Sequence, residues 1–150
     1  MIRSAVATWN GSPVIGEGLV TTSSGIMSNA LYASAGSSTG NDPCTSPSEI
    51  LAAAIASSVS LMLAREIVKE GLKPEHVKTE AVLTLEQDKT NWAIVKVDLH
   101  VTASLPEMDE HKFQKACKNA KARCAVTRAL NVPITITSKR EALHKGTVAA

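Results

Sequence analysis

The chain has 150 residues, of which 44% are hydrophobic, and a formal net charge of +2 at pH 7. A chain of this length is typical of one domain with a sizeable core, so we expect a single domain over residues 1–150. The small net charge does not favour nucleic acid as a partner. The three cysteines and four histidines lack the spacing of a disulfide scaffold or a metal site, so we expect no metal and no cofactor.

Neither a signal segment nor a membrane span is expected. Arg3 and Thr8 interrupt any apolar run near the N-terminus. The longest apolar stretch, within residues 50–64, is shorter than the roughly 18 residues that a spanning helix needs, and serines break it. We therefore expect a soluble, cytoplasmic protein that has no membrane partner.

The first third of the chain predicts short strands. Residues 5–9 are followed by Asn10-Gly11, a hairpin signal, and residues 14–22 and 25–32 predict two further strands. Residues 34–45 are rich in Ser, Gly and Asn, which predicts a loop.

Residues 46–71 predict a long helix. Ser46 and Glu49 have the spacing of a capping box, and Pro47 occupies the first helical position. Gly71 provides a left-handed stop. Because residues 50–64 are apolar or small on every face, we expect this helix to be buried on all sides at the centre of the fold.

The remaining segments predict a hairpin, two helices and a last strand. Residues 77–85 and 95–103 alternate apolar with polar side chains around a turn at 88–91, as in an antiparallel sheet with one face against helices. Asp109 predicts the cap of a helix that ends near Arg123, followed by a short helix at 125–130 and a strand at 134–138. We expect the tail from Glu141 to fray. This order predicts an α+β fold of antiparallel sheets on a long central helix.

A homodimer is the expected assembly. A helix with no polar face cannot be covered on all sides by a single sheet of about six strands, so a second subunit would hide the remainder. The alternative is that the second helix and the N-terminal strands cover it within one chain.

The order of elements, the helix start at 46–49 (Ser-Pro-Ser-Glu) and the turn at 124–127 (Cys-Ala-Val-Thr) resemble the OsmC/Ohr family of organic hydroperoxide reductases. The resemblance extends from about residue 8 to residue 138. It implies an OsmC-like α+β fold in an intertwined homodimer, with two active sites at the subunit interface.

The resemblance also implies a chemistry. In this family a low-pKa thiolate attacks the O–O bond of a small organic hydroperoxide and becomes a sulfenic acid, which a second cysteine resolves into a disulfide. An arginine and a glutamate orient the first thiolate. A dithiol reductant, in several members a lipoylated protein, then reduces the disulfide.

This sequence departs from the family pattern at the attacking residue. Ser58 stands at the position of the attacking cysteine, and a serine hydroxyl is un-ionised at neutral pH. Ile55 stands where the family has a histidine, and no arginine occurs between Arg3 and Arg65, so residues 34–38 lack the polarising arginine. The resemblance retains Glu49 and Cys124.

Three interpretations of Ser58 remain open: natural divergence, an engineered Cys→Ser change, and a thiol that has moved elsewhere. Cys44 is the candidate for a relocated thiol because it lies near the positive end of the long helix; the alternative is a loop cysteine with no role. Cys117 and Cys124 lie about 10 Å apart along one helix, too far for a disulfide, which needs Cα atoms within about 7 Å. Cys117 is therefore expected to be a small core residue.

These observations predict an OsmC-family protein of oxidative-stress defence with a degenerate site and weak or lost peroxidase activity. Cys124, Ser58 and Glu49 would form the site. One alternative is a dimeric, non-catalytic protein that binds a small apolar ligand; another is a dimeric scaffold with no ligand, if side chains fill the pocket.

Overall fold

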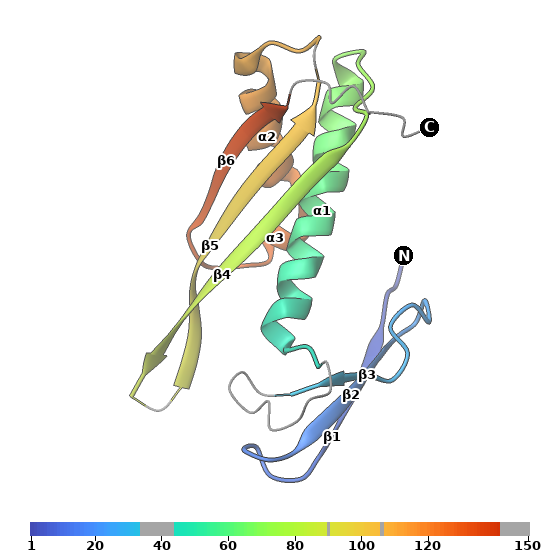
Figure 1. Cartoon of the computed structure of the whole chain (residues 1–150), viewed down its shortest axis with the longest axis vertical. Coiled ribbons are helices and arrows are strands. Elements are labelled where there is room, and N and C mark those ends of the chain that lie inside the picture. The colour runs from blue at the N-terminus through green and yellow to red at the C-terminus, as the bar shows by residue number, and fades with distance from the viewer. Residues whose placement is uncertain (34–43, 90, 106, 142–150) are drawn as a thin grey trace, which may run out of the picture. The chain divides into compact units, whose positions relative to one another are not determined.

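The computed structural model describes residues 1–33, 44–89, 91–105 and 107–141. The chain divides into two compact units, Met1–Leu51 and Ala52–Ala150, and each is described by itself. The expectation of one domain over residues 1–150 stays a prediction. In chain order the elements are β1 (Ala5–Asn10), β2 (Glu17–Thr22), β3 (Ala30–Tyr32), α1 (Pro47–Lys69), β4 (Val77–Asp88), β5 (Asn91–Ser104), α2 (Glu110–Arg123), α3 (Ala125–Arg128) and β6 (Ile134–Glu141) (Figure 1).

The first unit contains an antiparallel sheet in the order β1–β2–β3. Two of its strands are shorter than expected. Residues 14–16 belong to the turn that joins β1 to β2, closed by a bond from Gly16 N–H to Ser12 O, with Gly11 at φ +92°. Gly25, at φ +76°, lies in the next turn, so β3 begins only at Ala30. Apolar residues in both turns predict strand, but periodicity alone does not detect a glycine in the left-handed region.

Most side chains of this first sheet are exposed or half-buried. Among its strand residues only Gly18 is buried, where a Cβ would come within 2.3 Å of the Tyr32 ring. Val6 is 68% exposed, and Ile15 in the adjoining turn 76%. With one buried strand residue, this sheet has no core of its own within the unit. Small sheets need an apolar cover to be stable.

Both ends of α1 confirm the sequence prediction. Ser46 N–H donates to Glu49 Oε2 at 2.9 Å, and Glu49 N–H donates to Ser46 Oγ at 3.2 Å, which is the expected capping box. At the other end Gly71 has φ +78°, and its N–H donates to Val68 O.

The second unit contains a sheet in the order β4–β5–β6. The hairpin of β4 and β5 confirms the predicted antiparallel pair, which closes at Asp88 and Asn91. The pairing of β6 with β5 is parallel, and the expectation of purely antiparallel sheets is wrong at this pair. The chain crosses over through α2 and α3 and re-enters the sheet at the end where β5 began, and such a connection gives a parallel neighbour.

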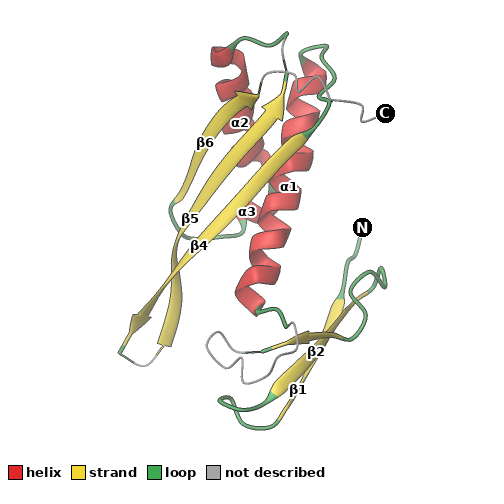
Figure 2. Cartoon of the chain, viewed as in Figure 1, coloured by secondary structure: helices red, strands yellow, loops and turns green. Residues whose placement is uncertain are grey.

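One face of this sheet and two helices form the core. Figure 2 shows α1 and α2 against the same sheet. Every second residue of β5 from 97 to 103 is at most 1% exposed. Positions spaced by three or four residues on each helix meet them, as the alternating and helical patterns predicted. The fully or almost fully buried helix side chains are Ile55, Val59, Leu63 and Ile67 of α1 and Phe113, Ala116, Cys117 and Ala120 of α2.

The opposite side of α1 is not buried within the chain. Leu61 is 56% exposed and Val68 60% exposed. Within the second unit, α1 is therefore buried on one side only. A covering second subunit stays a prediction.

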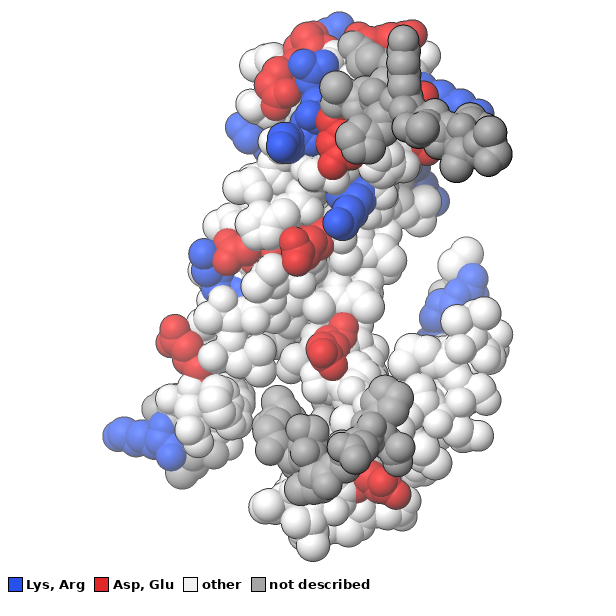
Figure 3. Space-filling view, viewed as in Figure 1, with Lys and Arg blue, Asp and Glu red and all other residues white. Residues whose placement is uncertain are grey.

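Contrary to the expectation from sequence, α1 is long and apolar enough to cross a membrane by length and composition, a test that the core helix of a soluble protein also passes. Within the chain, 28% of its most apolar window is buried. The visible surface of the second unit carries charges of both signs, intermixed toward the end where α1 stops (Figure 3).

Candidate functional site

Ser58 and Cys124 lie side by side in the second unit. Ser58 is in the middle of α1, and Cys124 forms the junction between α2 and α3 as the C-cap of one helix and the N-cap of the other. The Cys124 Sγ–H donates to Ser58 Oγ at 3.0 Å, although 66 residues separate the two in sequence. The side chain of Cys124 is 0% exposed. The fold thus brings together the two positions that the resemblance assigns to the attacking and resolving cysteines.

The surroundings of Cys124 favour its thiolate. Burial is the largest single influence on its pKa and raises it, because a charge is costly away from water. Hydrogen bonds from Ser58, Thr127 and Val126 together outweigh burial, so the pKa of the Cys124 thiol lies below its ordinary value. In the thiolate form the Ser58 hydroxyl is the donor and the sulfur the acceptor. The site therefore keeps one weakly acidic thiol beside a hydroxyl that cannot form a disulfide.

Thr127 holds the turn that carries Cys124. Its single hydroxyl proton is shared between Lys121 O at 2.6 Å and Cys124 O at 3.1 Å, and the residue is 5% exposed. The Arg128 N–H also donates to Cys124 O, at 3.1 Å. Thr127 is not among the predicted site residues, although it lies in the 124–127 turn that carries the family resemblance.

Glu49 lies in the first unit, at the start of α1. Its Oε2 accepts bonds from Ser46 N–H and from the hydroxyls of Ser46 and of Thr45, the last at 3.1 Å. The bond from the Ser46 N–H is the largest of several effects that hold the pKa of Glu49 below its usual value. Its contacts are those of a helix cap, and one carboxylate oxygen accepts all of them.

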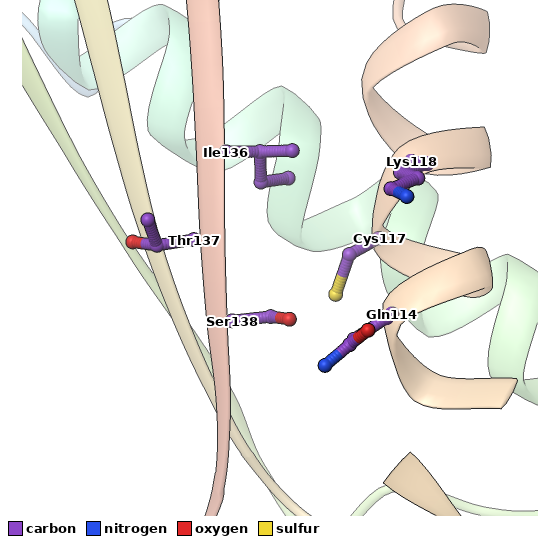
Figure 4. Close-up of a pocket in the computed structure, with 6 residues that line it drawn as sticks. All are labelled: Gln114, Cys117, Lys118, Ile136, Thr137 and Ser138. Carbon is purple, nitrogen blue, oxygen red and sulfur yellow. The ribbon is translucent and has the colours of Figure 1, made fainter. Parts of the chain in front are cut away.

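The other two cysteines are free thiols in different surroundings. Cys44, half-buried in the first unit, lies before the bridge that pairs Thr45 with Tyr32. Cys117 is 1% exposed, which confirms the expected core position, and burial raises the pKa of its thiol to about 11. It points toward Ser138 across a cavity of about 300 Å³ between α2 and β6 (Figure 4). Its high pKa makes Cys117 a poor nucleophile at neutral pH.

The neighbouring helix serines have ordinary structural partners. Ser57 donates to Ala53 O at 2.8 Å, and Ser60 donates to Thr79 Oγ1 at 2.8 Å. Residues 34–38, where the family arginine is expected, lie outside the described residues. Within the described ranges, no group of three or more His, Cys, Asp or Glu side chains is placed to hold a metal ion.

The fold and the paired side chains define a class of protein: a small α+β protein in which a long apolar helix presents one side chain to a low-pKa cysteine. The chain belongs to the OsmC-like protein family, whose model matches residues 39–139.

The sequence comparison supports this family, and the structure comparison supports the fold. Peroxiredoxin OsmC of Escherichia coli (strain K12) is 30% identical over 134 residues, which cover 89% of this chain and 93% of that protein. The organic hydroperoxide resistance protein OhrB of Bacillus subtilis superposes with a TM-score of 0.73 at 20% identity, covering 91% of this chain and 98% of that one. An OsmC-like protein of unknown function from Vibrio cholerae gives a TM-score of 0.75 at 17% identity, covering 93% and 99%.

Proposed function

We propose that this chain is an OsmC-family protein whose peroxide site is degenerate and whose thiol-dependent peroxidase activity is weak or lost. The observation that carries the proposal is the hydroxyl of Ser58, 3.0 Å from the Cys124 sulfur. A serine cannot take the place of a thiolate in the attack on an O–O bond, and it cannot resolve a sulfenic acid into a disulfide.

Cys124 is the thiol that would carry any residual activity. Its thiolate would attack the hydroperoxide, releasing the alcohol and leaving a sulfenic acid on the protein. The next step needs a second thiol in contact. Cys117 is buried with a raised pKa and lies about two helical turns from Cys124. An external dithiol would therefore have to reduce the sulfenic acid directly. Because Cys124 is 0% exposed, we expect this reaction to be slow.

The proposal is tested by the rate of cumene hydroperoxide reduction with a dithiol as reductant. We expect the wild-type rate to be close to the uncatalysed rate and any small excess to disappear in Cys124→Ser. Cys117→Ser serves as the matched control and should retain whatever rate the wild type has. Turnover by the wild type comparable to that of the Escherichia coli relative, assayed alongside, would contradict the proposal.

Binding without turnover is the second candidate function. Ile55 and Val59, on either side of Ser58 in α1, are fully buried, so the surroundings of the site are apolar. Such a site suits a small apolar ligand better than a charged one. Native mass spectrometry of the purified protein tests this candidate, and an unliganded mass that no added long-chain alcohol changes would count against it.

We further propose that the protein is a cytoplasmic homodimer. Exposed apolar side chains of α1, such as Leu61 and Val68, support a second copy as the cover, because monomeric proteins rarely expose large apolar patches. The absence of nucleic-acid and membrane partners stays a prediction.

A further inference from the structure

A buried carboxylate on α1 has no part in the proposed site. Glu66 is 7% exposed and lies next to Ile67 and one turn after Leu63, both of them in the core. Burying a charged group is costly unless other groups pair with it. Glu66 therefore needs a structural reason for its place on an otherwise apolar helix.

The partners of Glu66 come from two helices. Lys69 on α1 forms an ion pair with it, and Arg123 Nη1 from α2 lies 3.4 Å from Glu66 Oε1. The bond from Lys69 is the largest effect that lowers the pKa of Glu66; burial opposes it, and the charge of Arg123 and the amide of Asn119 add to the lowering. Glu66 is thus charged at neutral pH. Two α2 residues one turn apart, Asn119 and Arg123, reach it.

The contact with Arg123 is adjacent to the site. Arg123 is the last residue of α2, and Cys124 follows it directly. Ser58 and Glu66 are eight residues apart on α1, about 12 Å along the helix. The end of α2 is therefore held to α1 at two points: the Glu66–Arg123 ion pair and the Cys124–Ser58 hydrogen bond.

We propose that Glu66 is a positioning residue, which holds the Cys124 thiol against Ser58 by fixing Arg123 and the last turn of α2. The inference rests on the proposed function in one respect: Cys124 is taken as the remaining thiol of the site. Loss of the ion pair would let the end of α2 shift. The thiolate of Cys124 would then lose part of its hydrogen bonding.

Positioning and simple charge effects predict opposite results for Glu66→Gln. Removing the negative charge of Glu66 would leave several cations nearby. These are Arg123 and Lys69, with Lys112 and Lys115 of the adjacent groove. On charge alone, the Cys124 thiolate would become more stable and its pKa would fall. If Glu66 acts through position, the pKa rises.

The experiment measures the pKa of Cys124 by the ultraviolet absorbance of its thiolate, in a full-length Cys44→Ser, Cys117→Ala background. We expect Glu66→Gln to raise this pKa by about half a unit or more. Glu66→Asp keeps the charge but shortens the reach to Arg123, so we expect a rise there as well. An unchanged or lowered pKa in folded Glu66→Gln, with circular dichroism like that of the parent, overturns the proposal.

The matched control is Glu110→Gln. This change removes an ion pair between Glu110 and Arg140, 3.0 Å apart, which holds the other end of α2. We expect it to leave the pKa of Cys124 unchanged. A rise equal to that in Glu66→Gln would contradict a specific role of Glu66, because any loosening of α2 would then have the same effect.

If neither Glu66 variant folds, Arg123→Ala tests the same contact from α2, where the side chain is 62% exposed. Its effect is compared with that of Arg128→Ala, which removes a nearby cation that takes no part in the Glu66–Arg123 ion pair. A pKa shift in Arg123→Ala no larger than that in Arg128→Ala overturns the proposal. The titration needs no peroxide turnover, so a failed peroxidase assay and a failed positioning test remain distinguishable.

Discussion

The side chain at position 58 decides which covalent chemistry Cys124 can undergo. With the Ser58 oxygen 3.0 Å from the Cys124 sulfur, a sulfur at the same position would lie near disulfide-bonding distance after a small adjustment. We expect Ser58→Cys to form an intrachain disulfide with Cys124 on mild oxidation. The closed loop would stabilise the folded state by roughly 2–4 kcal/mol.

Mass spectrometry under non-reducing conditions measures this link as the loss of two hydrogen atoms, and thermal unfolding with and without reductant measures its effect on stability. Ser57→Cys is the matched control, since the Ser57 hydroxyl donates to Ala53 O and not toward Cys124. A link of equal yield in both variants would contradict the observed geometry. We expect no recovery of family-level turnover in Ser58→Cys, because no arginine lies between Arg3 and Arg65.

At the scale of single elements, the start of α1 depends on the charge of Glu49. The pKa of Glu49 in the folded chain lies below its ordinary value near 4.5, chiefly because of the bond from Ser46 N–H. The unfolded chain therefore binds a proton more readily than the folded chain. The contribution of Glu49 to stability is present above the ordinary pKa and is lost as the pH falls through the folded value.

We expect Glu49→Gln to be less stable than the wild type at neutral pH and to approach the wild type in acid. Chemical denaturation at a series of pH values measures the difference. Ser46→Ala, which removes the other half of the capping box, should cost about 1 kcal/mol at neutral pH. A constant gap between wild type and Glu49→Gln would show that the carboxylate charge does not support the helix.

Local signals explain which elements the sequence predicted well. The caps of α1 and α2 lie within three residues of the bonds they make, such as Asp109 Oδ1 accepting from Lys112 N–H at 2.8 Å, and both helices begin where these residues predicted. The parallel pairing of β6 depends on where the crossover returns the chain, which no local pattern records. The site residues likewise divide into those with a local sequence signal and those that depend on long-range packing.

Among the site residues, family motifs located Ser58 and Cys124, and the structure places them in contact. No sequence pattern predicts the contact between Glu66 and Arg123, because the two residues are 57 positions apart and belong to separate helices. The sequence does show an acidic residue, Glu66, beside the buried positions of α1. Which residue pairs with it depends on how α2 packs against α1.

At the scale of the whole molecule, α1 has apolar side chains that a single chain leaves exposed to solvent. Leu61 and Val68 are more than half exposed on the side away from the core, while Leu63 and Ile67 are fully buried. An apolar helix face of this kind needs a cover, from another protein copy or from lipid. The charged residues at the end of the same helix, Arg65, Glu66 and Lys69, favour a protein setting over the interior of a membrane.

Leu61→Arg tests the dimer proposal. If α1 of a second copy covers Leu61, the new charge would be buried without a partner, at a cost of about 3 kcal/mol or more, which weakens the dimer by roughly a hundredfold. We expect sedimentation to show a dimer for the wild type and a monomer for this variant at the same concentration. Val82→Arg, at a 42% exposed position of β4, is the matched control and should remain dimeric. A wild type that sediments as a monomer, or a Leu61→Arg variant that stays dimeric, would remove α1 from the interface.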